Sequence, residues 1–444
     1  MASRPDLMAT RLDRRSLLAA TGAGWAATAI PATSRAQEDV SLRVSLQPFW
    51  GPTEEPLDRT GQPSTFSTQL LPTYREAHPN VQLAIEAAVG GTEARTRYLL
   101  ECRQNAQADI IQLDGYWMAE FGAIGCTTPL DDLLPEELIA DYFEPFVARY
   151  NGQIVGLING TAFNSMLWYR EDWLEEAGFS EPPQDWNDLA TYAEALTVGD
   201  RFGLAFPGSR TEATSVVNLG FYWQEQDIFV DDDNRPAFNN ETSATIFNLL
   251  GDIFKAGWAP RDAINMAYED VEQLFYAEQA AMILHGSFIA PAVRQQPIAD
   301  RVGLSPNPVS PTTGRRATNA GGWGISIMTK DEAKLQPAAD FVTLFAGGDP
   351  EIMLGQLADA GYLPTQRSLA DNPQFTETAW DEIILSELPN ARTRPIVEIY
   401  PDASLEWTTA FQEVLSGQKD AATAVGEAEQ RTIALAEDRG YLTQ

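Results

Sequence analysis

The sequence predicts an α/β protein, and two observations support this prediction. Short apolar strands alternate with helices in the first quarter of the chain: strands are expected at 41–46, 81–85 and 109–113, and helices at 64–78 and 92–105. The chain also has 444 residues, of which 44% are hydrophobic, so it is long enough for two domains with a large core in each.

The stretch from 108 to 134 contains the clearest candidate for a ligand-binding segment. Its strand at 109–113 ends at Asp114, after which Gly115 frees the backbone to turn, and Tyr116 and Trp117 begin an amphipathic helix. An open α/β sheet binds its ligand at the carboxyl ends of its strands. We therefore expect Asp114 to accept hydrogen bonds from hydroxyls and the two rings to cover the apolar face of a sugar. The alternative is that Asp114 only caps the helix.

Three segments resemble a known family. The run DIIQLDGYW at 109–117 is followed by GCTTPLD at 125–131; residues 150–179 contain YNGQIVGL and LWYREDWLEEAGF; and residues 319–327 read NAGGWGISI. These segments resemble the extracellular solute-binding proteins that serve carbohydrate ABC importers, and the maltose/trehalose-type binding proteins are the nearest group. The resemblance covers nearly all of the chain after the first 36 residues.

This resemblance implies a fold and a division into lobes. The expected fold is that of a two-lobed α/β periplasmic binding protein of type 2, with a ligand cleft between the lobes and three hinge crossings near residues 155, 308 and 360. The implied N-terminal lobe comprises residues 37–155 and 309–358, and the implied C-terminal lobe comprises residues 156–308 and 359–444.

The resemblance also implies a function. The protein would be the periplasmic substrate-binding component of an ABC sugar importer. It would bind a neutral oligosaccharide such as trehalose, maltose or sucrose and deliver it, as a monomer without a cofactor, to the permease subunits in the inner membrane. Two alternatives stay open: a binder of another solute, such as a glucosylated osmolyte, a polyol or a peptide, and a glycoside hydrolase that uses Asp114 and Glu212 as its two carboxylates.

Matching the family's segments gives a set of candidate ligand-binding residues. They are Trp50, Asp114, Tyr116, Trp117, Phe163, Asn164, Glu212, Gly322, Trp323, Tyr362 and Arg394. Phe163 is a departure, because the family often has a sugar-binding aspartate at that position, and Asn164 is expected to take over part of the polar role. Three candidates have structural alternatives: a solvent-facing acid for Glu212, core packing for Trp323 and a structural salt bridge for Arg394.

The N-terminus has the features of an export signal. Arg14 and Arg15 precede a weakly apolar run at 19–30, which falls short of the ~20 apolar residues needed to span a bilayer. Paired arginines before a weak apolar core favour the twin-arginine route. Residues 1–36 are therefore expected to be a signal peptide cleaved after Ala36. No cysteine lies near that site, so a free periplasmic protein is favoured over a lipoprotein.

The chain is strongly acidic. Its 30 basic and 63 acidic residues give a net charge of −33, and removal of residues 1–36, with five arginines and two aspartates, takes it to −36. A charge of this sign argues against nucleic acid and anionic lipid as partners.

The cysteines and histidines are few. Cys102 and Cys126 lie at the ends of successive predicted helices, and export to an oxidising compartment allows a disulfide between them, with two buried thiols as the alternative. His78 and His285 lack the spacing of metal ligands and belong to no catalytic pattern. No metal site and no catalytic triad are therefore expected.

Overall fold

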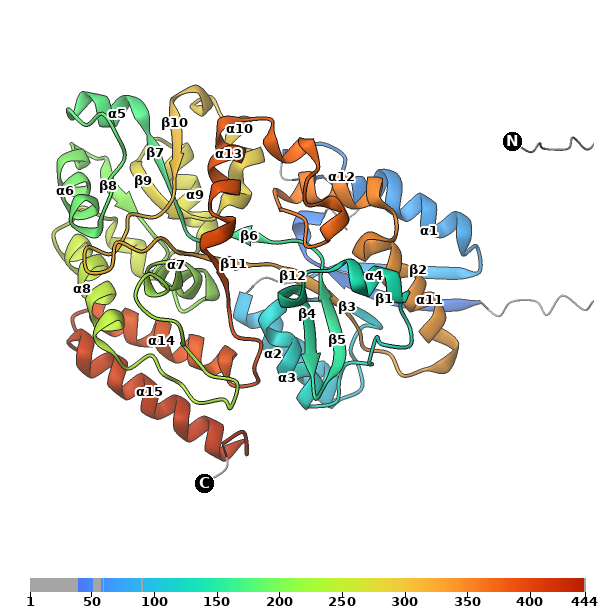
Figure 1. The fold of residues 1–444 in the computed structure, drawn as a ribbon. Helices are drawn as coiled ribbons and strands as arrows, with labels where there is room; N and C mark the ends of the chain where they lie inside the picture. The colour runs from blue at the N-terminus through green and yellow to red at the C-terminus, as the bar shows by residue number, and fades with distance from the viewer. Residues whose placement is uncertain (1–38, 51–56, 59, 89–90, 443–444) are drawn as a thin grey trace, which may run out of the picture. The chain divides into compact units, whose positions relative to one another are not determined.

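The computed structural model describes residues 39–50, 57–58, 60–88 and 91–442. The expected signal peptide at 1–36 lies outside the described residues. Strands and helices alternate over the described chain, as expected of an α/β protein (Figure 1). Within the described ranges, every helix is too short or too polar to cross a membrane.

The first sheet has six strands that come from separated parts of the chain. Their order across the sheet is β2 (Val81–Ala87), β1 (Val40–Leu46), β3 (Ile110–Asp114), β12 (Trp323–Ile327), β5 (Gln153–Ile158) and β4 (Val147–Tyr150). β1 pairs in parallel with β2 and β3, whereas β12 runs antiparallel between β3 and β5. The helices that follow these strands are α1 (Leu71–Ala77), α2 (Gly91–Arg103), α3 (Met118–Ala123), α4 (Glu136–Asp141), α11 (Glu332–Thr343) and α12 (Pro350–Ala360).

The turn between β4 and β5 has a simple sequence cause. Asn151 and Gly152 both have positive φ, at 49° and 79°. This backbone conformation suits Asn-Gly, and it joins two antiparallel strands with the right twist. Asn151 and Gly152 thus account for the hairpin between β4 and β5.

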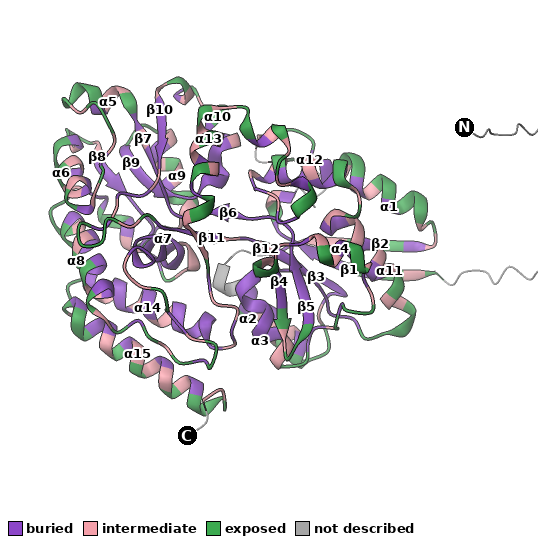
Figure 2. Cartoon of the chain, viewed as in Figure 1, coloured by how far each residue is buried: buried purple, intermediate pink, exposed green. Residues whose placement is uncertain are grey.

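The second sheet has four strands. Their order is β10 (Val302–Ser305), β7 (Met166–Arg170), β9 (Ala280–His285) and β8 (Phe202–Ala205). The helices associated with it are α5 (Glu171–Glu176), α6 (Trp186–Leu196), α7 (Glu212–Tyr222), α8 (Glu241–Lys255), α9 (Tyr268–Tyr276), α10 (Ala290–Arg294), α13 (Ala379–Ser386), α14 (Tyr400–Leu415) and α15 (Ala421–Asp438). Most strands of the two large sheets are buried, except the edge strand β2, whereas the helices show buried and exposed faces (Figure 2).

Three short strands lie where the chain passes from one large sheet to the other. β6 (Ala162–Phe163) connects β5 to β7, and β11 (Thr318–Gly321) connects β10 to β12. β11 pairs with β6 and with β13 (Ala391–Thr393). A third passage follows α12, where Leu363 pairs with Thr161. Since β5 stays in the first sheet to Ile158, the first passage begins a few residues after the expected position near 155.

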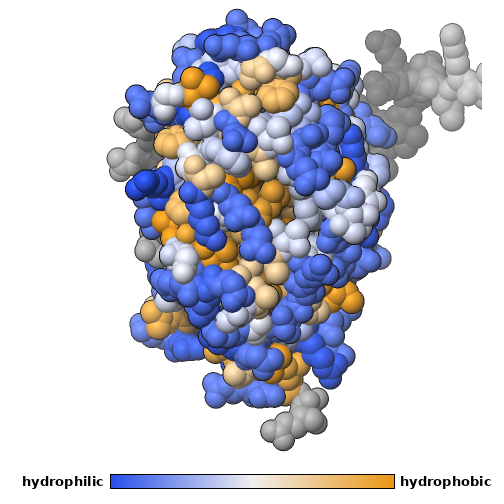
Figure 3. Space-filling view, turned by 90° about the vertical axis from the view of Figure 1, so that its left-hand side faces the viewer, coloured by the Kyte–Doolittle hydropathy of each residue, from blue (hydrophilic) through white to orange (hydrophobic). Residues whose placement is uncertain are grey.

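The C-terminal helices α14 and α15 pack on each other and on α7 and α8. The face on the left of Figure 1 is largely hydrophilic, with apolar side chains gathered near its middle (Figure 3). A hydrophilic exterior of this kind agrees with the strong net charge of the chain.

Candidate ligand-binding site

A cavity of about 610 Å³ lies where the first sheet, the helices beside the second sheet and the connecting strands meet. Its volume falls within the ~300–1,000 Å³ that is common for small-molecule sites. Nine of the predicted residues line it: Asp114, Tyr116, Trp117, Asn164, Glu212, Gly322, Trp323, Tyr362 and Arg394.

Glycines bring the backbone segments of this site together. The N–H of Gly115 donates to the carbonyl of Gly322 at 3.0 Å, which fixes the end of β3 against the β11–β12 junction. A Cβ atom on Gly322 would lie 1.8 Å from the carbonyl oxygen of Gly160, and one on Gly115 would lie 2.4 Å from Cδ1 of Ile158. The close approach therefore requires glycine at 322, where a Cβ would meet the backbone, whereas at 115 the end of the Ile158 side chain would have to shift.

Three charged side chains meet in the cavity. Arg394 donates from Nη2 to Oδ1 of Asp114 at 2.6 Å and from Nη1 to Oε1 of Glu212 at 2.9 Å. Glu212 also accepts hydrogen bonds from Tyr400, at 2.8 Å, and from Ser404. Asp114 stands at the end of β3 in the first sheet, and Glu212 begins α7 beside the second. Arg394 thus bridges acids from the two parts of the structure.

Burial decides the ionisation of this group. Burial raises the pKa of Asp114 to about 6; the Arg394 guanidinium opposes this rise, and the charge of Glu212 adds to it. Burial also disfavours the charge of Arg394, but Asp114 and Glu212 outweigh that effect and hold the pKa of Arg394 well above its ordinary value. Arg394 therefore stays charged in the cavity.

Aromatic rings form much of the remaining lining. The Arg394 guanidinium lies 4.2 Å from the centroid of the Tyr116 ring, a cation–π distance. Trp323 packs edge-on against Trp117, at 5.9 Å between centroids, and against Phe49, at 6.1 Å. Because Trp323 is only half-buried and lines the cavity, one part of its ring packs and another part is open to a ligand.

Two predicted residues lie outside the cavity lining. Trp50 is 1% exposed and packs against Phe345 and Tyr362, while its neighbour Phe49 lines the cavity. Phe163 is fully buried, while the next residue along the chain, Asn164, lines the cavity. In both places the predicted segment reaches the cavity, but the ring of the predicted residue lies in the core.

Other lining residues were not predicted. The first turns of α9 contribute Tyr268, Glu269 and Glu272, and Phe288 follows β9. Gln47 lines the wall beside the first sheet. The helical pattern of α9 could be read from the sequence, but no local signal showed that this face meets a ligand cavity.

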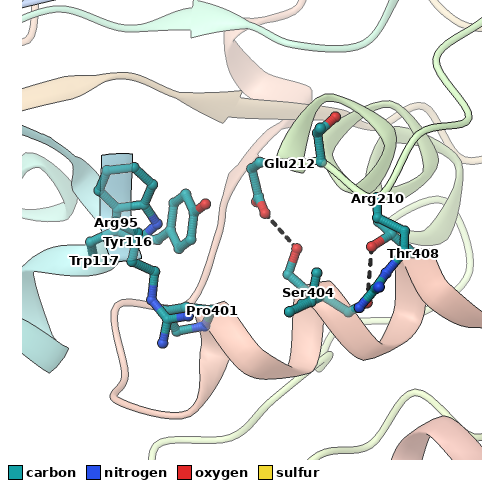
Figure 4. A pocket seen from close by; sticks show the side chains of 10 residues that line it. Arg95, Tyr116, Trp117, Arg210, Glu212, Pro401, Ser404 and Thr408 are labelled. Carbon is teal, nitrogen blue, oxygen red and sulfur yellow. Dashed lines mark hydrogen bonds between the residues drawn. The ribbon is translucent and has the colours of Figure 1, made fainter. Parts of the chain in front are cut away.

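A small pocket adjoins the cavity and shares Tyr116, Trp117 and Glu212 with it. Figure 4 shows Arg95 from α2 reaching toward Pro401 at the start of α14, with Ser404 hydrogen-bonded to Glu212. Its volume of about 10 Å³ holds about one water molecule. The pocket therefore extends the cavity only slightly.

Cys102 and Cys126 form a disulfide with a Cα–Cα distance of 5.9 Å. This bond joins the end of α2 to the segment after α3, outside the cavity lining. Within the described residues no group of three or more histidine, cysteine, aspartate or glutamate side chains is placed to hold a metal ion.

Solved structures share this fold. A maltose-bound protein from T. maritima, MalE3, superposes with a TM-score of 0.76 at 20% identity, over 89% of this chain and all of that chain. The GacH receptor of Streptomyces glaucescens, solved without ligand and with acarbose, gives a TM-score of 0.75 at 19% identity, over 90% of this chain and 99% of that chain. The fold is therefore that of the two-lobed maltose-binding type.

Sequence comparison gives the family. A protein of Brucella abortus (strain 2308) that carries the name of a binding protein is 21% identical over 318 residues, which cover 70% of this chain and 75% of that protein. A “Probable ABC transporter-binding protein” of Deinococcus radiodurans is 25% identical over 215 residues, 46% of this chain and 50% of that protein. The family model described as bacterial extracellular solute-binding protein matches residues 59–347. Because that match spans more than half of the chain, the protein belongs to the bacterial extracellular solute-binding proteins.

Proposed function

We propose that this protein is the periplasmic substrate-binding component of an ABC sugar importer. It binds a neutral oligosaccharide, most simply an α-glucosidic disaccharide such as trehalose, maltose or sucrose, and delivers it to the permease subunits in the inner membrane. One observation carries this proposal: a single cavity combines aromatic rings, carboxylates and one arginine, contributed by the first sheet, by helices beside the second sheet and by the connecting segments.

This combination suits a polyhydroxylated ligand. Aromatic rings such as Trp323 cover the C–H face of a sugar ring, while carboxylates accept strong hydrogen bonds from its hydroxyls. An anionic ligand is disfavoured, because both carboxylates at Arg394 already bind its guanidinium.

Binding in the ~µM range corresponds to about 8 kcal/mol. A few stacked rings and several hydrogen bonds can supply this free energy if two lobes close on the sugar. We take the lobes to be residues 37–155 with 309–358, and residues 156–308 with 359–444, except that β5 keeps residues 156–158 in the first sheet. The protein acts as a monomer in the periplasm after cleavage near Ala36, without a lipid anchor.

The ligand of a similar structure supports a sugar. The protein from T. maritima holds maltose. A polyol is the second candidate for this chain. It is favoured by the buried Phe163, which stands where the resemblance places a sugar-binding aspartate, and by a similar protein from Agrobacterium radiobacter solved with ribitol.

Hydrolysis is disfavoured by the geometry of the acids. Asp114 and Glu212 both bind Arg394, and Glu212 is further held by Tyr400 and Ser404. A glycosidase needs one acid to donate a proton and the other to attack or to activate water. Two acids joined through a shared guanidinium fit the positioning of a ligand better than such roles.

Isothermal titration calorimetry on the exported protein tests the proposal. The panel contains trehalose, maltose, sucrose, glucosylglycerol, ribitol and a short peptide, at low and high salt. Tight binding of one disaccharide is the expected result. Binding of ribitol alone would favour the second candidate, and silence across all sugars would overturn the proposal. Incubation of each glycoside with the protein, followed by chromatography, should show no cleavage.

A further inference from the structure

Four charged side chains outside the large cavity form a closed ring of ion pairs, which we name the ionic ring. It consists of Arg95, Glu120, Asp402 and Arg439. Nη2 of Arg95 lies 2.6 Å from Oε1 of Glu120 and 3.3 Å from Oδ2 of Asp402. Nη1 of Arg439 lies 2.5 Å from Oδ2 of Asp402 and 3.4 Å from Oε1 of Glu120. Charges alternate around the ring, so every ion has two neighbours of opposite sign.

The ring has two halves of different origin. Arg95 on α2 and Glu120 on α3 belong to helices that follow strands of the first sheet. Asp402 on α14 and Arg439 at the end of α15 belong to the helices that pack on α7 and α8, beside the second sheet. Each half contributes one cation and one anion and is neutral by itself.

The contacts within each half are closer than those between the halves. Arg95 binds Glu120 through two hydrogen bonds, of 2.6 and 2.7 Å, and Arg439 binds Asp402 through two, of 2.5 and 3.1 Å. The halves are joined by two single contacts, at 3.3 and 3.4 Å. If the halves separate, both close pairs persist and only the two longer contacts break.

We propose that the ionic ring is a latch between the lobes, and that its four members are positioning residues that set how readily the binding protein closes. This inference rests on the lobe closure of the proposed function. None of the four side chains lines the large cavity, and only Arg95 lines the small pocket beside it. The latch therefore acts on the closed state without touching a ligand in the large cavity. A mutation in the ionic ring should therefore change the ratio of closed to open molecules and leave the contacts with the ligand unchanged.

The physical setting favours such a device. Arg95, Glu120 and Asp402 are 8%, 3% and 6% exposed, so the attraction among these three is only weakly screened by solvent. Arg439 is exposed, so its two contacts are screened more strongly. Breaking a buried pair by removing one partner leaves an uncompensated charge, but separation of two neutral pairs leaves none. The latch can therefore open reversibly. The disulfide between Cys102 and Cys126 links the end of α2 to the end of α3, and so keeps Arg95 close to Glu120 in either state.

Charge exchange tests the latch without creating lone charges. The variant Arg95→Glu with Glu120→Arg keeps the pair in the first half but places like charges opposite Asp402 and Arg439. The variant Asp402→Arg with Arg439→Asp does the same from the second half. All four substitutions together restore alternating charges. Nitroxide labels at Glu76→Cys and Glu175→Cys, both exposed and on α1 and α5, report the separation of the two parts by pulsed electron spin resonance.

In ligand-free protein we expect each single-half exchange to lower the ratio of closed to open molecules at least ~10-fold, which corresponds to about 1.4 kcal/mol. The fourfold variant should recover most of that ratio. A matched control exchanges Glu406 and Arg431, an ion pair between α14 and α15 within the second part, and should leave the ratio unchanged. Near-ultraviolet circular dichroism confirms that each variant folds.

Two results would overturn the latch. One is a distance between the two labels that a single-half exchange leaves unchanged. The other is a fourfold variant whose ratio of closed to open molecules is no higher than that of the single-half variants. Because the labels report closure without a ligand, these outcomes are separate from those of the sugar panel. If the protein binds no sugar but its label distance changes with the charge exchanges, the proposed function is overturned and the latch is supported.

Discussion

Arg394 and Asp114 are 280 residues apart in the chain and are joined by two hydrogen bonds, of 2.6 and 3.3 Å. Glu212 binds the same guanidinium at 2.9 Å. The sequence left open whether Arg394 faces a ligand or forms a structural salt bridge. In the structure it pairs with two acids and also lines the cavity, so the salt bridge and the proposed contact with a ligand are compatible.

Replacement of Arg394 by glutamine should therefore destabilise the protein. It leaves Asp114, only 7% exposed, without its cation. Breaking one side of a buried pair costs about 3–5 kcal/mol. Urea unfolding followed by tryptophan fluorescence measures this loss. Arg392→Gln is the control, because Arg392 pairs with Asp227 at a more exposed position and should cost at most ~1 kcal/mol. Equal losses for the two variants would contradict the central role of Arg394.

The raised pKa of Asp114 predicts a pH dependence of stability. Its pKa is about 6 in the folded protein against an ordinary value of 3.8. Between these values the folded state holds a proton that the unfolded state has lost, so the contribution of Asp114 falls as the pH rises from about 4 to about 6 and is constant above that. Over this pH range the contribution of Asp114 to the free energy of unfolding falls by at most about 3 kcal/mol.

The measurement compares the wild-type protein with Asp114→Asn, whose side chain does not titrate, by urea unfolding at pH steps across this window. The free energy of unfolding of the wild type, relative to the variant, should decrease as the pH rises. A relative stability independent of pH would show that Asp114 titrates at its ordinary value.

Trp323 should act as a stacking platform. Its ring lines the cavity and is held edge-on by Trp117 and Phe49, so Trp323→Ala should weaken sugar binding roughly 10-fold or more in calorimetry with the best sugar of the panel. Trp50→Phe is the control: Trp50 is buried outside the cavity lining, so this variant should lose stability and keep its affinity. Unchanged affinity in Trp323→Ala would assign that ring to the core.

The disulfide should stabilise the fold and leave recognition unchanged. It closes a loop with a sequence separation of 24, for which restriction of the unfolded chain predicts ~3 kcal/mol. Cys102→Ser with Cys126→Ser should therefore shift the urea midpoint downward while the sugar affinity stays the same. A wild-type midpoint that does not respond to reductant would mean that the bond contributes nothing.

Much of the fold could be predicted because its signals are local. The apolar runs that became β1, β2 and β3 were read directly, and Asn151-Gly152 specified its hairpin. The pairing of β12 between β3 and β5 could not be read from local pattern. It depends on strands far apart in the chain, and here the family resemblance supplied what periodicity does not.

In the candidate site, too, local sequence predicts some features and contacts between distant segments set the others. Phe49 lines the cavity and Trp50 does not, although they are adjacent in one short helical turn; Asn164 lines it and Phe163 does not. The sequence locates such a segment, but the direction of each side chain is set by the packing around it. For the same reason the acids of α9 and the ionic ring were not foreseen, because their partners come from other helices.

The 280 residues between Asp114 and Arg394 also bear on the order in which the protein assembles. Asp114 leaves the ribosome first, Trp323 completes its strand pair with Asp114 much later, and Arg394 follows later still. Contacts of such long range form slowly, since the intervening chain must be ordered first. A nascent chain can thus build much of its first sheet while the cavity still lacks a wall. The cavity is completed only after Arg394 has emerged, so a chain that stops before Arg394 could keep much secondary structure and yet bind nothing.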